Sequence, residues 1–242
     1  MRVRSGLVTS LVVLATAGAC ANVQVTERKI LVDEKVPRPD HIFVQDFIST
    51  PGDVPSDSSL AGHASTGCPP QTPEQIALGR EIGAELAKAL VAEIGSMGLP
   101  AVHATSQPSP DVGDLVIRGT LLTVEEGSAA ERVAIGMGKG AAELKVAVEG
   151  YQMTDHGLRE VGSGTLDTSA SKSPGAAVPL AVAVATKNPL GLIVSTGVKL
   201  HGEETGSSTI HGKVKDVAKA IAEQLRPRFE KQGWIPPSAS AP

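Results

Sequence analysis

The stretch AAELKVAVEGYQMTDHGLREVGSGTLDTSA, residues 141–170, decides the fold. Over residues 141–153 its apolar and polar side chains alternate, with a period of two that is typical of a β-strand. Asp155-His156-Gly157 has the composition of a turn, and residues 158–170 return to a strand-like pattern. Two strands around a short turn predict a hairpin, and hence an antiparallel meander. The residues expected on the inner face of its first strand are Leu144, Val146, Val148 and Gly150.

Three earlier stretches also favour β-structure. Residues 42–47, IFVQDF, suit a pleated surface, and residues 101–104 predict a short strand. Residues 114–124 alternate and place Leu115, Ile117 and Leu121 on an inner face.

Two helices accompany these strands. Thr72 can cap the first helix, Pro73 suits its first position, and Gln75 completes a capping box. An apolar stripe follows, and Gly98 suits the left-handed end of this helix. The second helix is expected at residues 213–226, where Pro227 should end or kink it. The stripe of the first helix consists of Ile76, Ile82, Leu86, Leu90, Ile94 and Met97.

These elements predict a single α+β domain over residues 40–235, with a mainly antiparallel sheet. Two inserts interrupt it. Residues 49–73 are rich in proline, glycine and serine and predict a long polar loop. Residues 174–198 are almost wholly apolar but are split by Lys187 and Pro189, which argues against a membrane-spanning helix. This apolar insert is either buried against the sheet or a surface that meets a partner or the membrane. Residues 236–242 are expected to be a disordered tail.

The N-terminus indicates export. Arg2 and Arg4 precede an uncharged run over residues 7–19, as in a secretory signal peptide that is too short to span a bilayer. Ala17-Gly18-Ala19 before Cys20 resembles the lipobox of bacterial lipoproteins, in which the cysteine is acylated. We therefore expect a lipoprotein signal peptide at 1–19, lipidation of Cys20, and a tether leading into the domain at 20–39. The alternative is an ordinary signal peptide, with Cys20 a plain thiol.

Composition excludes several classes of function. The net charge changes from −4 to −6 on loss of residues 1–19, because they hold two arginines and no acidic residue. An acidic chain with 2% aromatic residues offers neither a basic face nor stacking platforms, so no nucleic-acid partner is expected. Apart from Cys20, Cys68 is the only cysteine, which excludes a disulfide scaffold.

No motif predicts catalysis, a metal or a cofactor. The glycine run at 136–140 is G-x-G-x-G and precedes a strand, whereas dinucleotide binding needs G-x-G-x-x-G at the start of a helix. Gly162-Ser163-Gly164 lacks the spacing of a nucleophile elbow, so Ser163 is expected in a strand or turn. The six histidines show no metal-binding spacing. The chain is therefore not expected to be an enzyme.

Four segments together resemble a family, domain of unknown function 4410: residues 42–47, the capped helix, residues 132–146 with the glycine run, and Gln232-Gly-Trp-Ile235. This family consists of bacterial envelope lipoproteins without an established activity. In the order of its elements the chain is also similar, more distantly, to the curli-secretion lipoprotein and to lipoprotein activators of peptidoglycan synthases. That similarity implies two amphipathic helices packed on one face of the sheet.

These resemblances imply a role in contacting other envelope components. Ala21 follows Cys20, where an aspartate commonly retains Gram-negative lipoproteins in the inner membrane, so we expect an outer-membrane anchor facing the periplasm. The expected function is a non-catalytic binding or assembly module. Its partners would be the membrane, through the lipid on Cys20, and an envelope protein. The alternative is an oligomeric component of an export or secretion system.

Overall fold

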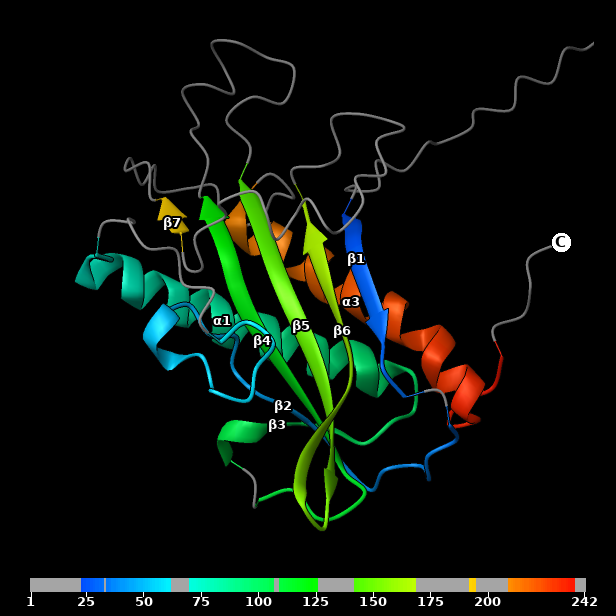
Figure 1. Ribbon diagram of the computed structural model, residues 1–242. Helices are drawn as coiled ribbons and strands as arrows, with labels where there is room; N and C mark the ends of the chain where they lie inside the picture. The colour runs from blue at the N-terminus through cyan, green and yellow to red at the C-terminus, as the bar shows by residue number, and fades with distance from the viewer. Residues whose placement is uncertain are drawn as a thin grey trace, which may run out of the picture.

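A computed structural model shows a mixed seven-stranded sheet with two long helices (Figure 1). It describes residues 23–32, 34–61, 70–106, 109–125, 142–168, 192–194 and 209–237. The strand order is β1-β6-β5-β4-β2-β3, and β7 also pairs with β4. The strands are β1 (Gln24–Ile30), β2 (Ile42–Val44), β3 (Ala101–His103), β4 (Leu115–Glu125), β5 (Glu143–Thr154), β6 (Gly157–Asp167) and β7 (Leu192–Val194).

The predicted meander forms the centre of the sheet. Strands β4, β5 and β6 pair antiparallel in sequence order, and the turn between β5 and β6 contains Gly157 with φ of 105°. The expected inner residues Leu144, Val146 and Val148 all lie in the main core. The strand alternation of the sequence is therefore confirmed here, and Ser163 lies in β6.

The other half of the sheet adds short parallel pairs to the predicted, mainly antiparallel arrangement. Strand β2 pairs parallel with both β3 and β4, and β7 pairs parallel with the end of β4. The reason is topological: helix α1 lies between β2 and β3 in the chain, and such a crossover returns the chain in the same direction. The α+β class is confirmed, but the sheet is mixed.

Strand β1 was not expected. The sequence predicts a lipidated tether and an entry segment at residues 20–39, whereas Gln24–Ile30 within this range pairs antiparallel with β6 and forms one edge of the sheet. The hydrogen bond from the Leu31 amide to the carbonyl of Val161 (3.2 Å) extends this pairing beyond the strand. The described domain therefore begins well before residue 40.

Helix α1 (Pro73–Ser96) begins as predicted. The Thr72 hydroxyl accepts a hydrogen bond from the Gln75 amide (3.3 Å), and the Gln75 side chain accepts one from the Thr72 amide (2.9 Å). Gly98, with φ of 80°, follows the end of this helix. Along α1, Ile82, Leu86, Leu90 and Ile94 are fully buried.

Helix α3 (Ile210–Gln232) is longer than expected and continues through Pro227. Proline inside a helix costs about 3 kcal/mol. The turns beyond it offset this cost because Phe229 is buried in the core, together with Trp234 and Ile235 just past the helix. The helix ends at Gly233, with φ of 78°.

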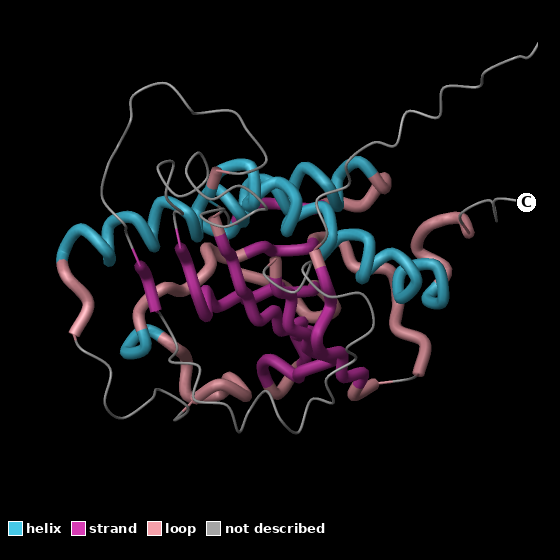
Figure 2. The backbone as a smooth tube through the Cα atoms, turned by 90° about the horizontal axis from the view of Figure 1, so that it is seen from above, coloured by secondary structure: helices cyan, strands magenta, loops and turns pink. Residues whose placement is uncertain are grey.

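Both helices lie on one face of the sheet, as expected (Figure 2). Their apolar stripes pack against the inner residues of β2, β4, β5 and β6 in one core. The opposite face carries a small cluster of Phe43, Val116 and Tyr151, and residues 51–61 contact this face through the hydrogen bonds described below. Part of the predicted polar loop at 49–73 is therefore ordered; it includes a 3-10 turn at Pro51–Asp53 and a buried Ser58.

Side-chain hydrogen bonds join residues 32–36, which follow β1, to the C-terminal end of α3 and to Trp234 just beyond it. The Gln232 side chain accepts a hydrogen bond from the Val36 amide (2.7 Å) and donates one to the Glu34 carbonyl (3.0 Å). The Trp234 indole donates to the Val36 carbonyl (3.1 Å), and Arg228 donates to the carbonyl of Val32. These bonds fix the link between β1 and β2 against the end of α3.

Candidate functional site

Several residues singled out by the sequence lie outside the described part of the chain. They are Cys20, Cys68 and the glycine run at 136–140. The apolar insert at 174–198 also lies outside it, except for the β7 backbone at 192–194. Lipidation of Cys20 and the role of the insert therefore stay predictions.

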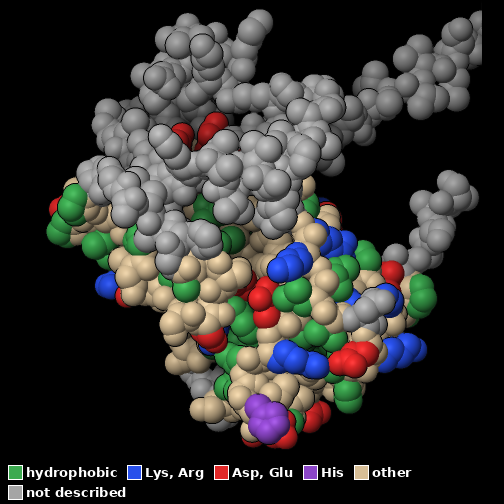
Figure 3. All heavy atoms as spheres, in the orientation of Figure 1, with side chains coloured by type: hydrophobic (Ala, Val, Ile, Leu, Met, Phe, Trp, Pro, Cys, Tyr) green, Lys and Arg blue, Asp and Glu red, His purple; other side chains and the backbone are tan. Residues whose placement is uncertain are grey.

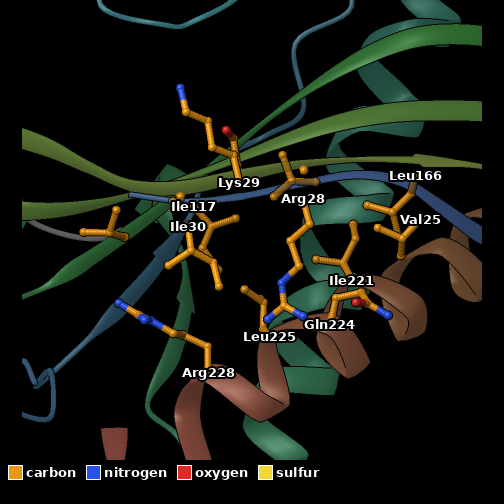
Figure 4. Close-up of a pocket in the computed structure, with 16 residues that line it drawn as sticks. Val25, Arg28, Lys29, Ile30, Ile117, Leu166, Ile221, Gln224, Leu225 and Arg228 are labelled. Atoms are coloured by element: carbon orange, nitrogen blue, oxygen red, sulfur yellow. The ribbon is translucent and has the colours of Figure 1, made fainter. Parts of the chain in front are cut away.

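A pocket of about 130 Å³ lies between helix α3 and the sheet where β5, β6 and β1 meet (Figure 4). Its walls are mostly apolar, with Val25 and Ile30 on β1 and Ile221 and Leu225 on α3. Arg28 extends from β1 toward α3, while Lys29 points away from the pocket. We call this space the β1–α3 pocket. Its other lining residues are Ile117, Val148, Gly150, Val161, Gly162, Ser163, Gly164, Leu166, Gln224 and Arg228.

Glycines on β5 and β6 explain why the pocket is open. Gly150, Gly162 and Gly164 line it and supply no side chain to fill the space beneath α3. At Gly162 a side chain is excluded, because its β-carbon would lie 2.9 Å from the carbonyl oxygen of Lys29. The close approach of β1 therefore requires a glycine at this position, and the pocket is one result.

The charges around the pocket are one-sided. Arg28 and Arg228 line it, and no aspartate or glutamate is among its lining residues. This contrasts with the whole chain, in which acidic residues outnumber basic ones by 26 to 22. An apolar space beside two guanidinium groups is suited to an apolar group that carries negative charge next to it.

A polar cluster lies on the opposite face of the sheet. Glu149 of β5 is only 4% exposed, and it accepts hydrogen bonds from the Ser58 hydroxyl (2.7 Å), the Ser59 amide (2.8 Å) and hydroxyl (2.5 Å), and the Tyr151 hydroxyl (3.1 Å). Arg118 lies over the Tyr151 ring, 4.8 Å from its centroid, and its guanidinium binds both carboxylate oxygens of Asp57. This arrangement satisfies a buried carboxylate and fastens residues 57–59 to the sheet.

On the face that carries this cluster, neither positively nor negatively charged side chains gather into a patch of one sign. In Figure 3 acidic, basic and apolar side chains lie interspersed on the part of this face that is coloured. We therefore interpret the polar cluster as structural and the β1–α3 pocket as the candidate binding site.

The described histidines form pairs with carboxylates. The shortest are His103 with Asp46 and His211 with Glu85, both 2.6 Å. Within the described residues, no three histidine, cysteine, aspartate or glutamate side chains gather to hold a metal ion. In the same part of the chain, neither helix is apolar enough over a sufficient length to cross a membrane.

Sequence reasoning missed the pocket because it missed β1. The segment QVTERKI holds two apolar residues among five polar ones, too few for a clear strand pattern. Gly162 and Gly164 were considered only as parts of a nucleophile motif. Their relevant property, the absence of side chains beneath a helix, appears only once α3 is placed.

The family model described as "Domain of unknown function (DUF4410)" matches residues 42–186, more than half of the chain. The chain belongs to this family. The match spans β2 to β6 and α1, so the central sheet of this DUF4410 protein is the part that it shares with the family.

Among solved structures, the DUF4410 chain is similar to two PelC dodecamers from Paraburkholderia phytofirmans, one of them a point variant. For the variant the identity is 12%, the TM-score is 0.39, and the match covers 85% of this chain and 96% of the other. For the second the corresponding values are 13%, 0.35, 82% and 96%. We draw nothing about function from a likeness at this level. No curated protein matches the DUF4410 chain.

Proposed function

We propose that this DUF4410 protein is a lipoprotein anchored in the outer membrane and facing the periplasm, where it acts as a non-catalytic binding or assembly module of the envelope. The signal-peptide pattern of residues 1–19, Cys20 and the following Ala21 support the anchor. The β1–α3 pocket supports the binding role.

The position of β1 carries this proposal. Gln24 is four residues after Cys20, and four extended residues span at most about 14 Å. A lipid on Cys20 would therefore hold the edge of the sheet close to the membrane surface. The same strand lines the β1–α3 pocket, so anchor and binding surface would share one element of the fold.

The anchor is tested by the mass of the N-terminal peptide of protein extracted from membranes, with Cys20→Ala as the control. We expect a peptide that begins at Cys20 and carries a lipid-sized increment, which is lost in the control. Stable attachment requires more than one acyl chain. Recovery of an unmodified peptide from soluble protein would overturn the membrane part of the proposal.

The location and the assembly state need separate measurements. Density-gradient separation of the two membranes should place the protein in the outer-membrane fraction. Light scattering of the protein in detergent should give a monomer over a range of concentrations. A large assembly would instead favour the alternative of an oligomeric export component.

A further inference from the structure

We propose that the outer edge of β1 and the β1–α3 pocket bind an extended acidic segment of a partner protein, which adds to β1 as a strand and inserts one apolar side chain into the pocket. This inference rests on the proposed function, because it names the chemistry of the partner of a binding module.

The first observation is the open edge. β1 pairs with β6 on one side, and among the described strands none pairs with its other side. The backbone groups of such an edge bind extended peptides through main-chain hydrogen bonds. Ile30 and Leu31, at the end of this edge, are 51% and 43% exposed, so apolar side chains lie beside the open backbone groups.

The second observation is the size of the pocket. An engineered apolar cavity of about 150 Å³ binds benzene, so a pocket of about 130 Å³ holds one leucine- or phenylalanine-sized group. A whole acyl chain is much larger than this space. The size therefore favours a single side chain of a protein over a lipid tail.

The third observation is the placement of charge. Successive side chains of a strand point to opposite faces, so an added strand presents every second residue to the pocket side. Arg28 and Ile30 lie on this side of β1, and Arg228 of α3 also lines the pocket. No acidic side chain lines the pocket. A partner segment would therefore complement the pocket if it held one apolar residue, with one acidic residue two positions before it and another two positions after it.

The test uses the full chain in phosphatidylcholine nanodiscs and a fluorescently labelled peptide, threonine-glutamate-threonine-leucine-threonine-glutamate-threonine. Anisotropy gives its affinity, and hydrogen exchange reports on the amides of β1. We expect saturable binding that protects these amides. Replacing both glutamates by lysine, or the leucine by alanine, should weaken binding by about tenfold or more.

Protein variants locate the site. Arg28→Glu should weaken peptide binding by about tenfold or more, whereas Lys88→Glu, an exposed charge reversal on α1, should leave it unchanged. Gly150→Val should also abolish binding. A β-carbon on Gly150 lies 3.6 Å from Val161, an ordinary contact, so the added side chain enters the pocket from β5; the thermal midpoint, compared with that of the wild type, checks that the variant is folded.

Four results would overturn the inference: no binding of the peptide, equal binding to Arg28→Glu or Gly150→Val, equal binding of the lysine peptide, or binding of sodium dodecanoate in place of the peptide. A dimer that Arg28→Glu dissociates, with no peptide bound, would assign the edge to a second copy of this chain. Mass spectrometry of Cys20 and membrane fractionation are unaffected by these outcomes, so failure of this site is distinguishable from failure of the proposed function.

Discussion

The ring of Phe47 occupies the space that a side chain on Gly119 would need. A β-carbon on Gly119 would lie 2.1 Å from two carbons of this ring. On the other side, a β-carbon on Gly83 of α1 would lie 2.1 Å from the carbonyl oxygen of Phe47, whose amide donates to the Gly83 carbonyl (3.2 Å). Because Gly83 of α1 and Gly119 of β4 have no side chains, both elements pack closely against Phe47, which lies between them.

We expect Gly83→Ala to destabilise the protein by about 3 kcal/mol, because the new methyl group meets backbone and the helix must shift. Gly95→Ala in the same helix is the matched control. Nothing lies within 4 Å of its added β-carbon, so we expect a gain of about 0.5 kcal/mol from better helix propensity. Urea unfolding followed by circular dichroism measures both, and equal effects of the two substitutions would refute the close approach.

Glu149→Ala should cost about 3 kcal/mol, because it removes a buried carboxylate and leaves the hydroxyls of Ser58 and Ser59 without their acceptor. Residues 57–59 should then become accessible to proteases, since Glu149 fastens them to the sheet. Exposed Glu81→Ala on α1 is the control, with little change expected. Limited proteolysis with mass spectrometry checks this, and an unchanged cleavage pattern at 57–59 would contradict it.

Alkaline pH should destabilise the fold through Tyr151. Burial, and then the charge of Glu149, raise the pKa of the Tyr151 hydroxyl above its ordinary value. The folded chain therefore keeps this proton after the unfolded chain begins to lose it, near pH 10, so the free energy of unfolding should fall as the pH rises above about 10.

The measurement is direct because Tyr151 is the only tyrosine of the chain. The tyrosinate absorbance should appear only well above pH 10, or together with unfolding. Tyr151→Phe is the control, since other groups also titrate in this range; only the difference between the two proteins reports on Tyr151. If the tyrosinate absorbance of the folded protein had its midpoint near pH 10, this would show that burial does not raise the pKa of Tyr151.

Gln232→Leu should cost about 2 kcal/mol, because it leaves the Val36 amide and the Glu34 carbonyl without partners. Hydrogen exchange should quicken first in β1 and the segment that follows it. Lys215→Ala, an exposed change on the same helix, should have little effect. If hydrogen exchange became faster by the same factor over the whole domain, this would contradict the proposal that Gln232 specifically stabilises this segment.

The elements that the sequence predicts best are those in which a short-range pattern decides the structure. The alternation around Leu144 and the capping box of Thr72 and Gln75 depend on neighbouring residues, and both are confirmed. The parallel pairing of β2 and the continuation of α3 through Pro227 depend on contacts with distant residues. No local pattern contains this information.

The candidate site was the least predictable part. Residues 24 and 167 are register partners although they are far apart in the chain, and the pocket exists only where β1, β6 and α3 meet. Arg28 and Gly162 have no distinctive sequence context of their own. They become relevant because the Lys29 carbonyl of β1 leaves too little room for a side chain at Gly162 and because both residues line the pocket beneath α3.

The bonds between Gln232 and the segment after β1 join residues that are 196 and 198 positions apart. A chain that is exported from its N-terminus delivers β1 first and the end of α3 last. Contacts between such distant residues also form slowly, because a long loop must close before they can stabilise anything. In the proposed anchored form, the segment that follows the strand nearest the membrane would thus be the last to be secured, after β1 has paired with β6. A product whose synthesis stops before residue 228 would keep the pairing of β1 with β6 but would lack the side chains that bind Val32, Glu34 and Val36.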